Sequence, residues 1–375
     1  MQKLCTAAIA AWGVQNCCRT HRSSARSTTF RPSHGWAKGN RALDRCARLL
    51  AVASHLALRN GGLLESPEAD VGLAAGTMLG GATSIVEFDW SGITDGPSYV
   101  SPMGFANTVI NAAAGQTAIK HQLRGVNSTI SSGQSSGLAA IAYAARNLAL
   151  GRAEYLLAGG VEELCPQTYE GLAANGLLAT DGAARPFASD RTGLTLGEAS
   201  ALFLLETTNS LSKRGRTGLA TIASSAFAQN AADVEGSGYP DPSLLARKIH
   251  AALSDAGIER EQIACLVLSG NGSKKGDAVE AEALQSVFGA NLAKVPACAP
   301  KAAIGDTLGA SSAFAAVVAA LALERGCLPP TPQSGNLEYD LALSAQTQPI
   351  AGEYALVCSA GFYGDAAAMV LRSCR

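Results

Sequence analysis

The chain has 375 residues, of which 47% are apolar and only 16% are charged, and its formal net charge is −1 at pH 7. This length and composition predict a globular protein with a large core and exclude a disordered or fibrous chain. No basic stretch is dense enough to predict nucleic-acid binding, and no run of about 18 strongly apolar residues predicts a membrane span.

Strands and helices alternate along the first half of the chain. Strands are indicated by short apolar or β-branched runs, and helices by apolar residues that recur at helical spacing. We predict, in chain order, a strand at Leu4–Ala11, a helix at Asn40–Arg59, a strand at Val71–Ala75, a helix at Asn111–Gln122, a strand at Ser128–Ser132, a helix at Leu138–Leu150 and a strand at Tyr155–Ala158.

The second half repeats this rhythm. We predict a strand at Leu219–Phe227, a helix at Ser243–Ala256, a strand at Ile263–Leu268, helices at Asp277–Phe288 and Ser311–Arg325, and strands at Tyr354–Ser359 and Ala366–Leu371. Such alternation predicts α/β layers with mainly parallel sheets covered on both faces. The similar order of elements suggests two duplicated halves, residues 1–210 and 211–375.

A strand-turn-helix elbow is predicted at Ser131–Gly137, which has the sequence SSGQSSG. An elbow of this kind presents one side chain at a helix N-terminus, where free N–H groups favour negative charge. Acyl-transfer enzymes use that geometry for a cysteine of lowered pKa beside an oxyanion hole. Gln134 occupies that position here. On this segment alone, an ordinary glycine and serine turn is the better explanation.

Six further motifs follow the elbow in a fixed order, together with the loop that closes the chain's last strand pair. They are Leu156–Glu162, Arg185–Phe187, Asp190–Gly193, Gly197–Ser200, Gly270–Ser273, Lys301–Ala310 and Ser359–Gly364. In this order and spacing the chain resembles the β-ketoacyl synthase family over nearly its whole length. The resemblance implies an α/β fold, the thiolase-like layered αβαβα fold with two duplicated halves.

The resemblance also implies a catalytic site that this chain has lost. The family condenses acyl thioesters with one cysteine and two histidines, and the matching positions here are Gln134, Asn271 and Asp306, while the family lysine is retained as Lys301. Glutamine cannot form the acyl thioester, and asparagine cannot shuttle a proton near neutral pH. Asp306 would place negative charge where an enolate oxygen develops. We therefore expect no catalytic residue, and also no cofactor and no metal, since the ten cysteines lack metal-ligand spacing and suit reduced thiols in a cytoplasmic protein.

Glutamine at the elbow marks two groups within the family. One is the chain-length factor of type II polyketide synthases, which forms a heterodimer with an active ketosynthase. The other is a loading domain that decarboxylates malonyl units and retains both histidines. The loss of both histidines favours the chain-length factor, whose partners would be the active ketosynthase and, through it, an acyl carrier protein with its polyketide chain, with neither nucleic acid nor membrane.

The resemblance places a tunnel and interface segment at Met103–Asn111. Its bulky Met103 and Phe105, with Ala106 and Thr108, would set the depth of the partner's tunnel, although ordinary core residues of a helix entry would show the same pattern. Gln134 would fill the vacated pocket and satisfy N–H groups of the elbow at the interface-facing turn.

Three other functions stay open. The chain could decarboxylate malonyl-carrier protein, or it could be an acyltransferase that uses one of the elbow serines, Ser132, Ser135 or Ser136, although none has an evident base. It could also be a structural homodimer that only binds. The product of the pathway, aromatic or reduced polyene, is not readable from the sequence.

Overall fold

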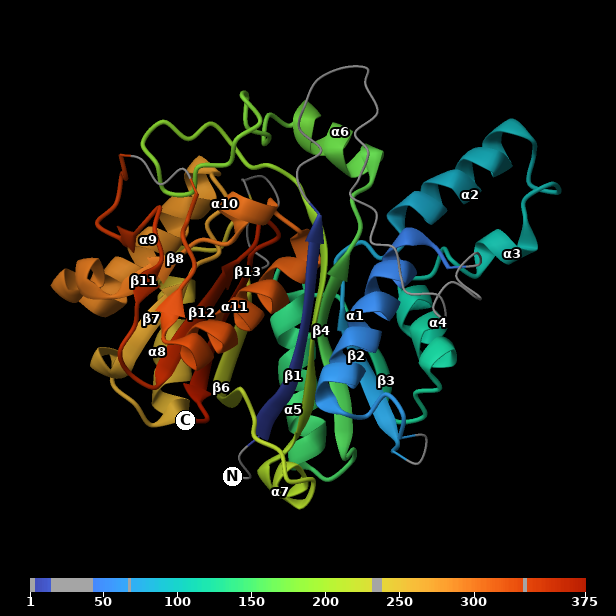
Figure 1. Cartoon of the computed structure of the whole chain (residues 1–375). Helices are drawn as coiled ribbons and strands as arrows, with labels where there is room; N and C mark the ends of the chain where they lie inside the picture. Colours follow the sequence, from blue (N-terminus) through green and yellow to red (C-terminus); the bar gives the residue numbers. More distant parts are fainter. Residues whose placement is uncertain (1–3, 15–42, 67–68, 231–237, 333–335) are drawn as a thin grey trace.

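The protein is described by a computed structural model that covers residues 4–14, 43–66, 69–230, 238–332 and 336–375, with the backbone alone for residues 4–14. Two stacked β-sheet halves alternate with helical layers. Figure 1 shows the layers edge-on, with helices outside each sheet and further helices between the sheets. This arrangement confirms the predicted αβαβα layering.

The N-terminal half contributes five strands to an 11-stranded sheet and has helices on both faces of them. Its elements are β1 Leu4–Val14, α1 Arg45–Gly61, β2 Val71–Gly76, α2 Ala82–Thr94, α3 Pro102–Phe105, α4 Ala112–His121, β3 Asn127–Ile130, α5 Ser136–Ala149, β4 Tyr155–Glu162, α6 Pro166–Ala174, β5 Glu198–Thr207 and α7 Thr208–Lys213. The strands lie in the order β3-β2-β4-β5-β1. Helices α1 and α4 cover the outer face, and α5 packs on the inner face.

The C-terminal half repeats this topology. Its elements are β6 Ala220–Gln229, α8 Pro242–Ala256, β7 Ile263–Val267, α9 Lys274–Phe288, β8 Pro296–Cys298, α10 Lys301–Ile304, α11 Ser311–Arg325, β9 Cys327–Leu328, β10 Ala342–Leu343, β11 Gln348–Pro349, β12 Tyr354–Ala360 and β13 Asp365–Ser373. Its main strands lie in the order β8-β7-β12-β13-β6, the same order as their counterparts in the first half. The two halves are therefore duplicates in fold, while the boundary at residue 210 stays a prediction.

The sheets are mixed, so the expectation of mainly parallel sheets was wrong. In the N-terminal half β5 runs antiparallel to both β4 and β1, and in the C-terminal half β13 runs antiparallel to both β12 and β6. The remaining long pairings, β2 with β3 and β4 and β7 with β12, are parallel. Continuous apolar strands indicate burial on both faces, but they do not distinguish the two directions.

Most predicted elements lie within three residues of the observed bounds, and two do not. Strand β4 continues to Glu162 rather than ending at Ala158. The helix expected from Asn40 begins at Arg45, because Asp44 caps it: the Asp44 side chain accepts a hydrogen bond from the Ala47 N–H at 2.7 Å. Residues 40–42 of that prediction lie outside the described ranges.

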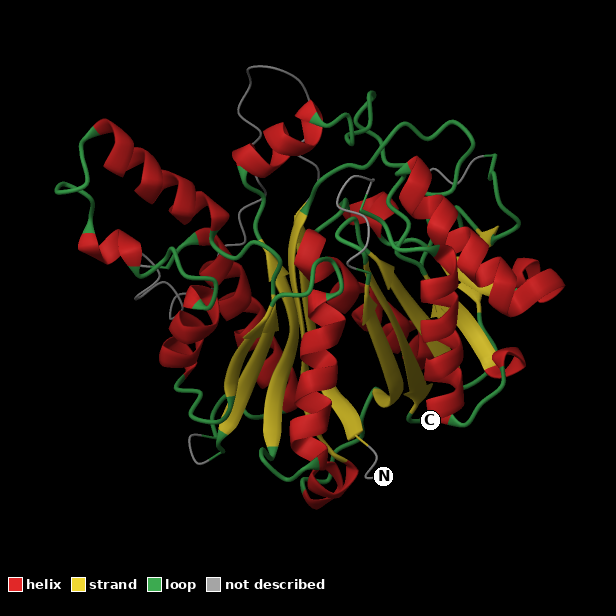
Figure 2. Ribbon diagram, turned by 180° about the vertical axis from the view of Figure 1, so that it is seen from behind, coloured by secondary structure: helices red, strands yellow, loops and turns green. Residues whose placement is uncertain are grey.

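Residues 82–111, which we call the protrusion, were not predicted to be helical before Asn111. They form α2, α3 and the connecting loops, and both ribbon views show them standing away from the body (Figures 1 and 2). No residue of α2 or α3 is buried, so neither helix has the one-sided apolar face on which a sequence-based prediction depends. Stacking of Phe88 on Phe105, with ring centroids 5.9 Å apart, connects the two helices.

Helix α11 lies between the two sheets and contacts β5 and β12. The stretch Leu308–Arg325, which includes it, is apolar and long enough to cross a membrane by composition, but 72% of it is buried inside the protein. Its apolar character is that of a core helix, since most of its side chains pack against strands of both halves.

Candidate functional site

The elbow residue Gln134 lies between the end of β3 and the start of α5, and its side chain is fully buried. The turn depends on Gly133, which has a φ of +60°, a left-handed conformation that other residues rarely adopt. A Cβ atom at Gly133 would also lie 2.3 Å from Asp365 Oδ1. The predicted elbow therefore exists, and it turns where the glycine allows it.

Asp365, the first residue of β13, is hydrogen-bonded to the elbow. Its Oδ2 accepts hydrogen bonds from the backbone N–H of Ser135 at 2.8 Å and from the Ser135 hydroxyl at 2.6 Å. Burial raises the pKa of Asp365, and the two bonds from Ser135 oppose that shift. The expectation that no elbow serine has a base in reach was wrong for Ser135. However, Ser135 is only 2% exposed, so the contact clamps the turn instead of presenting a nucleophile.

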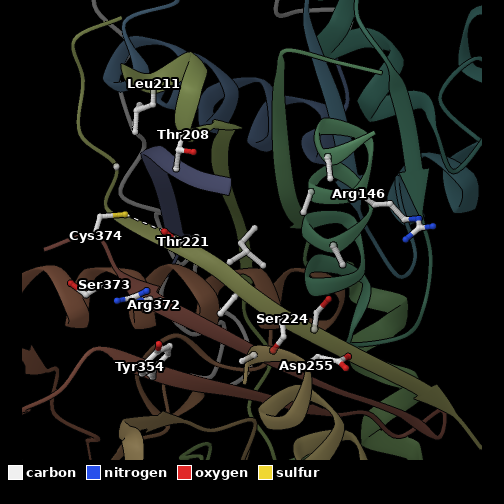
Figure 3. Close-up of a pocket in the computed structure, with 18 of the residues that line it drawn as sticks. Arg146, Thr208, Leu211, Thr221, Ser224, Asp255, Tyr354, Arg372, Ser373 and Cys374 are labelled. Carbon is white, nitrogen blue, oxygen red and sulfur yellow. Dashed lines mark hydrogen bonds between the residues drawn. The ribbon is translucent and has the colours of Figure 1, made fainter. Parts of the chain in front are cut away.

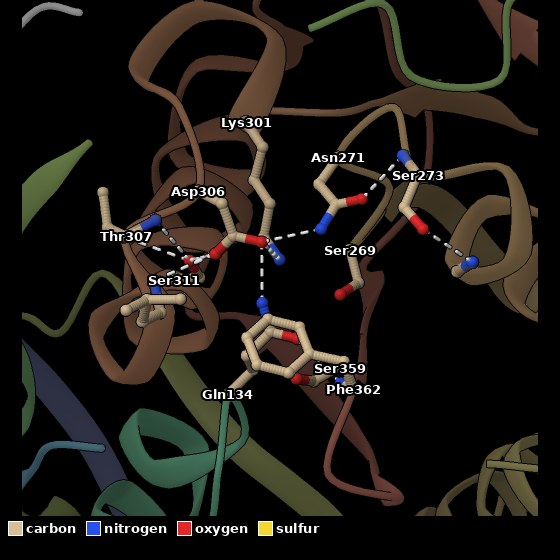
Figure 4. A network of polar contacts seen from close by, with 12 residues as sticks. Gln134, Ser269, Asn271, Ser273, Lys301, Asp306, Thr307, Ser311, Ser359 and Phe362 are labelled. Atoms are coloured by element: carbon tan, nitrogen blue, oxygen red, sulfur yellow. Dashed lines mark hydrogen bonds and ion pairs between the residues drawn. The ribbon is translucent and has the colours of Figure 1, made fainter. Parts of the chain in front are cut away.

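The side chains of Gln134, Asn271 and Lys301 converge on one carboxylate oxygen. Asp306 Oδ2 accepts hydrogen bonds from Gln134 Nε2 at 2.6 Å, from Asn271 Nδ2 at 2.8 Å and from Lys301 Nζ at 3.1 Å (Figure 4). Gln134 and Asp306 are fully buried, and Asn271 and Lys301 are 4% and 5% exposed. The structure thus brings together all three degenerate positions and the retained lysine. We call these four residues the Asp306 cluster.

The second oxygen of Asp306 and the remaining polar atoms of the cluster are also bonded. Asp306 Oδ1 accepts from the Leu308 N–H at 2.9 Å and from the Ser311 hydroxyl at 3.0 Å. Asn271 Oδ1 accepts from the Ser273 N–H at 2.9 Å. With five donors around it, the buried Asp306 carboxylate has little capacity left to accept a hydrogen bond from a substrate.

Gln134 also accepts a hydrogen bond from a backbone N–H group. Its Oε1 accepts a hydrogen bond from the Phe362 N–H at 3.3 Å. The expectation that Gln134 satisfies N–H groups of the elbow was therefore wrong, since the Ser135 N–H bonds to Asp365 and the glutamine reaches across to Phe362. A free backbone N–H facing the elbow is the kind of group that stabilises an oxyanion, and here it is already bonded.

Asp277 positions the loop that carries Asn271, a role that was not predicted from the sequence. Its Oδ1 accepts from the backbone N–H groups of Asn271 and Gly272 at 3.0 and 3.2 Å, and its Oδ2 accepts from the Phe187 N–H at 2.7 Å. Burial raises the pKa of Asp277 to about 6. The signal in the sequence was an acidic residue in the first turn of a helix that follows a glycine-rich loop.

Family models match both halves of the chain: "Beta-ketoacyl synthase, N-terminal domain" matches residues 20–210, and "Beta-ketoacyl synthase, C-terminal domain" matches residues 219–334. The chain belongs to the β-ketoacyl synthase family. A 3-oxoacyl-(acyl-carrier-protein) synthase 2 from Rhizobium meliloti (strain 1021) is 30% identical over 357 residues, which cover 89% of this chain and 82% of that protein.

Solved structures show the same ketosynthase fold. The ishigamide ketosynthase/chain length factor superposes with a TM-score of 0.88 at 21% identity and 99% coverage of both chains. A type II polyketide synthase acyl-carrier protein in complex with its ketosynthase gives a TM-score of 0.83 at 22% identity, again over 99% of both chains. At these identities the likeness establishes the thiolase-like ketosynthase fold.

Little space is available inside the chain beside the cluster. A cavity of about 10 Å³ is lined by Lys301, Ser269 and Ser311. This volume is about that needed for a single water molecule and is far too small for an acyl group.

A larger groove, of about 1050 Å³, lies elsewhere (Figure 3). It runs between the C-terminal half of α5 and strand β6. Tyr143 and Arg146 of α5 line it, and so do Arg372 and Cys374 near the end of the chain. The elbow is at the opposite end of α5, more than two helical turns away. The groove is therefore separate from the Asp306 cluster.

The predicted tunnel residues lie on the protrusion and not in this chain's interior. Met103 and Phe105 are 81% and 58% exposed, Ala106 is exposed, and Thr108 is half-buried. The alternative that they are ordinary core residues is therefore wrong. None of them lines the 10 Å³ cavity or the 1050 Å³ groove.

Proposed function

We propose that this chain is a non-catalytic ketosynthase subunit, a chain-length factor, that pairs with an active ketosynthase and shapes the tunnel for its growing polyketide. The observation that carries the proposal is the Asp306 cluster, in which the positions of the nucleophile and both proton-transfer residues are bonded to each other. The family membership supplies the context of carbon chain extension on carrier proteins.

The cluster supports the loss of catalysis on three grounds, two of which depend on the Gln134 side chain. Gln134 has no ionisable nucleophile. The charge of Asp306 lies 2.6 Å from Gln134 Nε2, where a condensation or decarboxylation would develop a negative oxygen. The Phe362 N–H, which could oppose that charge, is bonded to the glutamine itself. A change at Gln134 would also free the Phe362 N–H, but it would leave the charge of Asp306 in place.

Two surfaces support a partner subunit. Strand β3 is the edge strand of the sheet, paired only with β2 among the described strands, and it lies directly before the elbow. Unpaired edges are templates for adding a strand from another chain. The protrusion adds exposed apolar side chains that a free monomer would not leave in water, with Tyr99 80% and Ile93 76% exposed.

The shape of the tunnel would then come from the protrusion. Met103 and the exposed part of Phe105, whose ring also contacts Phe88, would enter a cavity of the partner from α3. In this arrangement the acyl carrier protein delivers its chain to the cysteine of the active subunit. The present chain contributes the apolar wall that stops elongation.

Co-expression with an active ketosynthase of the same pathway tests the proposal. We expect the two chains to co-purify in a one-to-one ratio, and we expect this chain alone to be poorly soluble. A stable, soluble homodimer that ignores the ketosynthase would instead support the structural homodimer.

Replacing Phe105 by alanine tests the tunnel assignment. Removal of the ring deepens the partner's tunnel, so the products of the pair should lengthen by one or more two-carbon units, as measured by mass spectrometry. Phe105→Met is the matched control, because it keeps an apolar side chain of similar length, and its products should stay close to the parent length. Unchanged products with Phe105→Ala would contradict the tunnel role.

The decarboxylase alternative needs its own measurement. Purified chain is incubated with malonyl-carrier protein, and acetyl-carrier protein is measured by mass spectrometry. We expect none above background, because Asp306 disfavours the enolate. Acetyl product that disappears in Gln134→Ala would show that the decarboxylase assignment is correct. A malonyl group that is transferred intact from the carrier thiol to the chain, and is no longer transferred in Ser135→Ala, would indicate the acyltransferase.

A further inference from the structure

In the protrusion and in the sequence on either side of it, the charged side chains are all acidic. Residues 60–119 contain no lysine, arginine or histidine, although the chain has 29 lysines and arginines among 375 residues. The protrusion carries three exposed carboxylates, Glu87, Asp89 and Asp95. None of them forms a salt bridge within the described ranges. Their charge is therefore not balanced by an ion pair with any described residue.

The same carboxylates lie among exposed apolar side chains. In α2, Glu87 and Asp89 flank the Phe88 that stacks on Phe105, and Trp90, 64% exposed, follows directly. Interfaces commonly have an apolar centre with a polar rim. A surface that is apolar and acidic is complementary to an apolar cleft bordered by cations.

We propose that the protrusion inserts into an apolar cleft of the active ketosynthase subunit whose rim carries lysine or arginine side chains that face Glu87 and Asp89. This inference rests on the proposed pairing and adds the chemistry by which the partner is selected. The occupant is the active subunit and not a second copy of this chain. A two-fold dimer would place the same surface of both copies at the interface, and with it the carboxylates of both protrusions.

Opposite charges at an interface rim act mainly on the rate of association and on the choice of partner. Complementary fields raise association rates by about 10- to 1000-fold, and salt removes the effect because the Debye length falls to about 3 Å at 1 M. The inference therefore predicts an association rate that depends on ionic strength and on the sign of charge at two α2 positions.

The experiment compares two double variants with the same change in net charge. Glu87→Lys with Asp89→Lys reverses the charge of the protrusion, and Glu282→Lys with Asp340→Lys reverses one glutamate and one aspartate that are exposed in the C-terminal half. All four positions are exposed, so both variants should fold, which circular dichroism checks. Association with the ketosynthase recovered by co-expression is measured on an immobilised chain in 50 mM and 500 mM NaCl.

In 50 mM NaCl we expect the protrusion variant to associate about tenfold more slowly than the parent, and the control variant within about twofold of it. In 500 mM NaCl the three rates should converge. Equal slowing of both variants, or an unchanged rate for the protrusion variant, overturns the charge complementarity while the heterodimer itself stands. If no ketosynthase is recovered, or if the parent chain dimerises with itself as tightly as with the ketosynthase, both the inference and the proposed function fail.

Discussion

Replacing Asp306 by asparagine removes the charge at the centre of the Asp306 cluster. Lys301 Nζ lies 3.1 Å from Asp306 Oδ2, with the side chains 6% and 0% exposed, so the substitution leaves a buried ammonium without its salt-bridge partner. The new amide nitrogen is itself a donor placed among donors, and only one oxygen remains to accept. The substitution is nearly isosteric, so its cost comes from charge and hydrogen bonding and not from a cavity.

The expected loss of unfolding free energy is about 4 kcal/mol, within the range for breaking one side of a buried ion pair. Lys301→Met should cost less, about 2 kcal/mol, since the Asp306 carboxylate keeps its four other donors. The double variant no longer buries an unpaired ammonium. We therefore expect it to cost about 4 kcal/mol and not the sum of about 6, which is a coupling of about 2 kcal/mol.

Urea unfolding of the purified chain, followed by far-ultraviolet circular dichroism, measures the three variants against the parent. Asp340→Asn is the control, because this aspartate is exposed and its replacement should change stability by less than about 0.5 kcal/mol. A loss below about 1 kcal/mol for Asp306→Asn, or strict additivity in the double variant, would refute the idea that the cluster is a buried charge held by its donors.

Two further predictions concern residues beside the cluster. Burial raises the pKa of Glu280 to about 7, above its ordinary value of 4.5, so the folded state holds the proton more tightly and stability is lost as the pH rises through that range. Glu280→Gln should flatten this dependence in urea unfolding at pH 5.5 and 8, with a gain at pH 8 relative to pH 5.5 of about 2 kcal/mol, at about 1.36 kcal/mol per pKa unit. Gly133→Ala should destabilise by about 2 to 4 kcal/mol, because its Cβ would meet a carboxylate oxygen at 2.3 Å as well as a φ of +60°. Gly151→Ala, at a φ of +67° with no atom within 4 Å of the added Cβ, isolates the backbone cost of about 1 kcal/mol, and similar losses at both glycines would contradict the close contact below the elbow.

The regular elements were predictable where a local signal bounds them. Helix α11 begins and ends at the predicted residues Ser311 and Arg325, because a glycine-rich turn precedes it and Gly326, with a φ of +72°, ends it. The protrusion was not predictable in this way. Its helices bury no residue, so their stability comes from Phe88 on Phe105 and from contacts outside any periodic pattern.

The candidate site was predictable only in part, and for a different reason. Family resemblance named Gln134, Asn271 and Asp306, but it gave no contacts among them. Gln134 and Asp306 are 172 residues apart in the chain, and no local pattern indicates that an amide at one position donates to a carboxylate at the other. The hydrogen bond from Ser135 to Asp365 was not predicted, because an acidic residue at the start of a strand suggests a surface position.

The degenerate cluster connects the two duplicated halves. Gln134 belongs to the first half, and its two amide atoms bond to Asp306 and Phe362 in the second. In an active ketosynthase the same junction must keep a nucleophile and proton-transfer residues free to react, so those groups cannot be saturated by one another. A subunit whose partner supplies the chemistry has no such requirement. Under the proposed function, saturating the junction stabilises the scaffold that presents β3 and the protrusion, and it prevents a second reactive site from competing for the acyl chain.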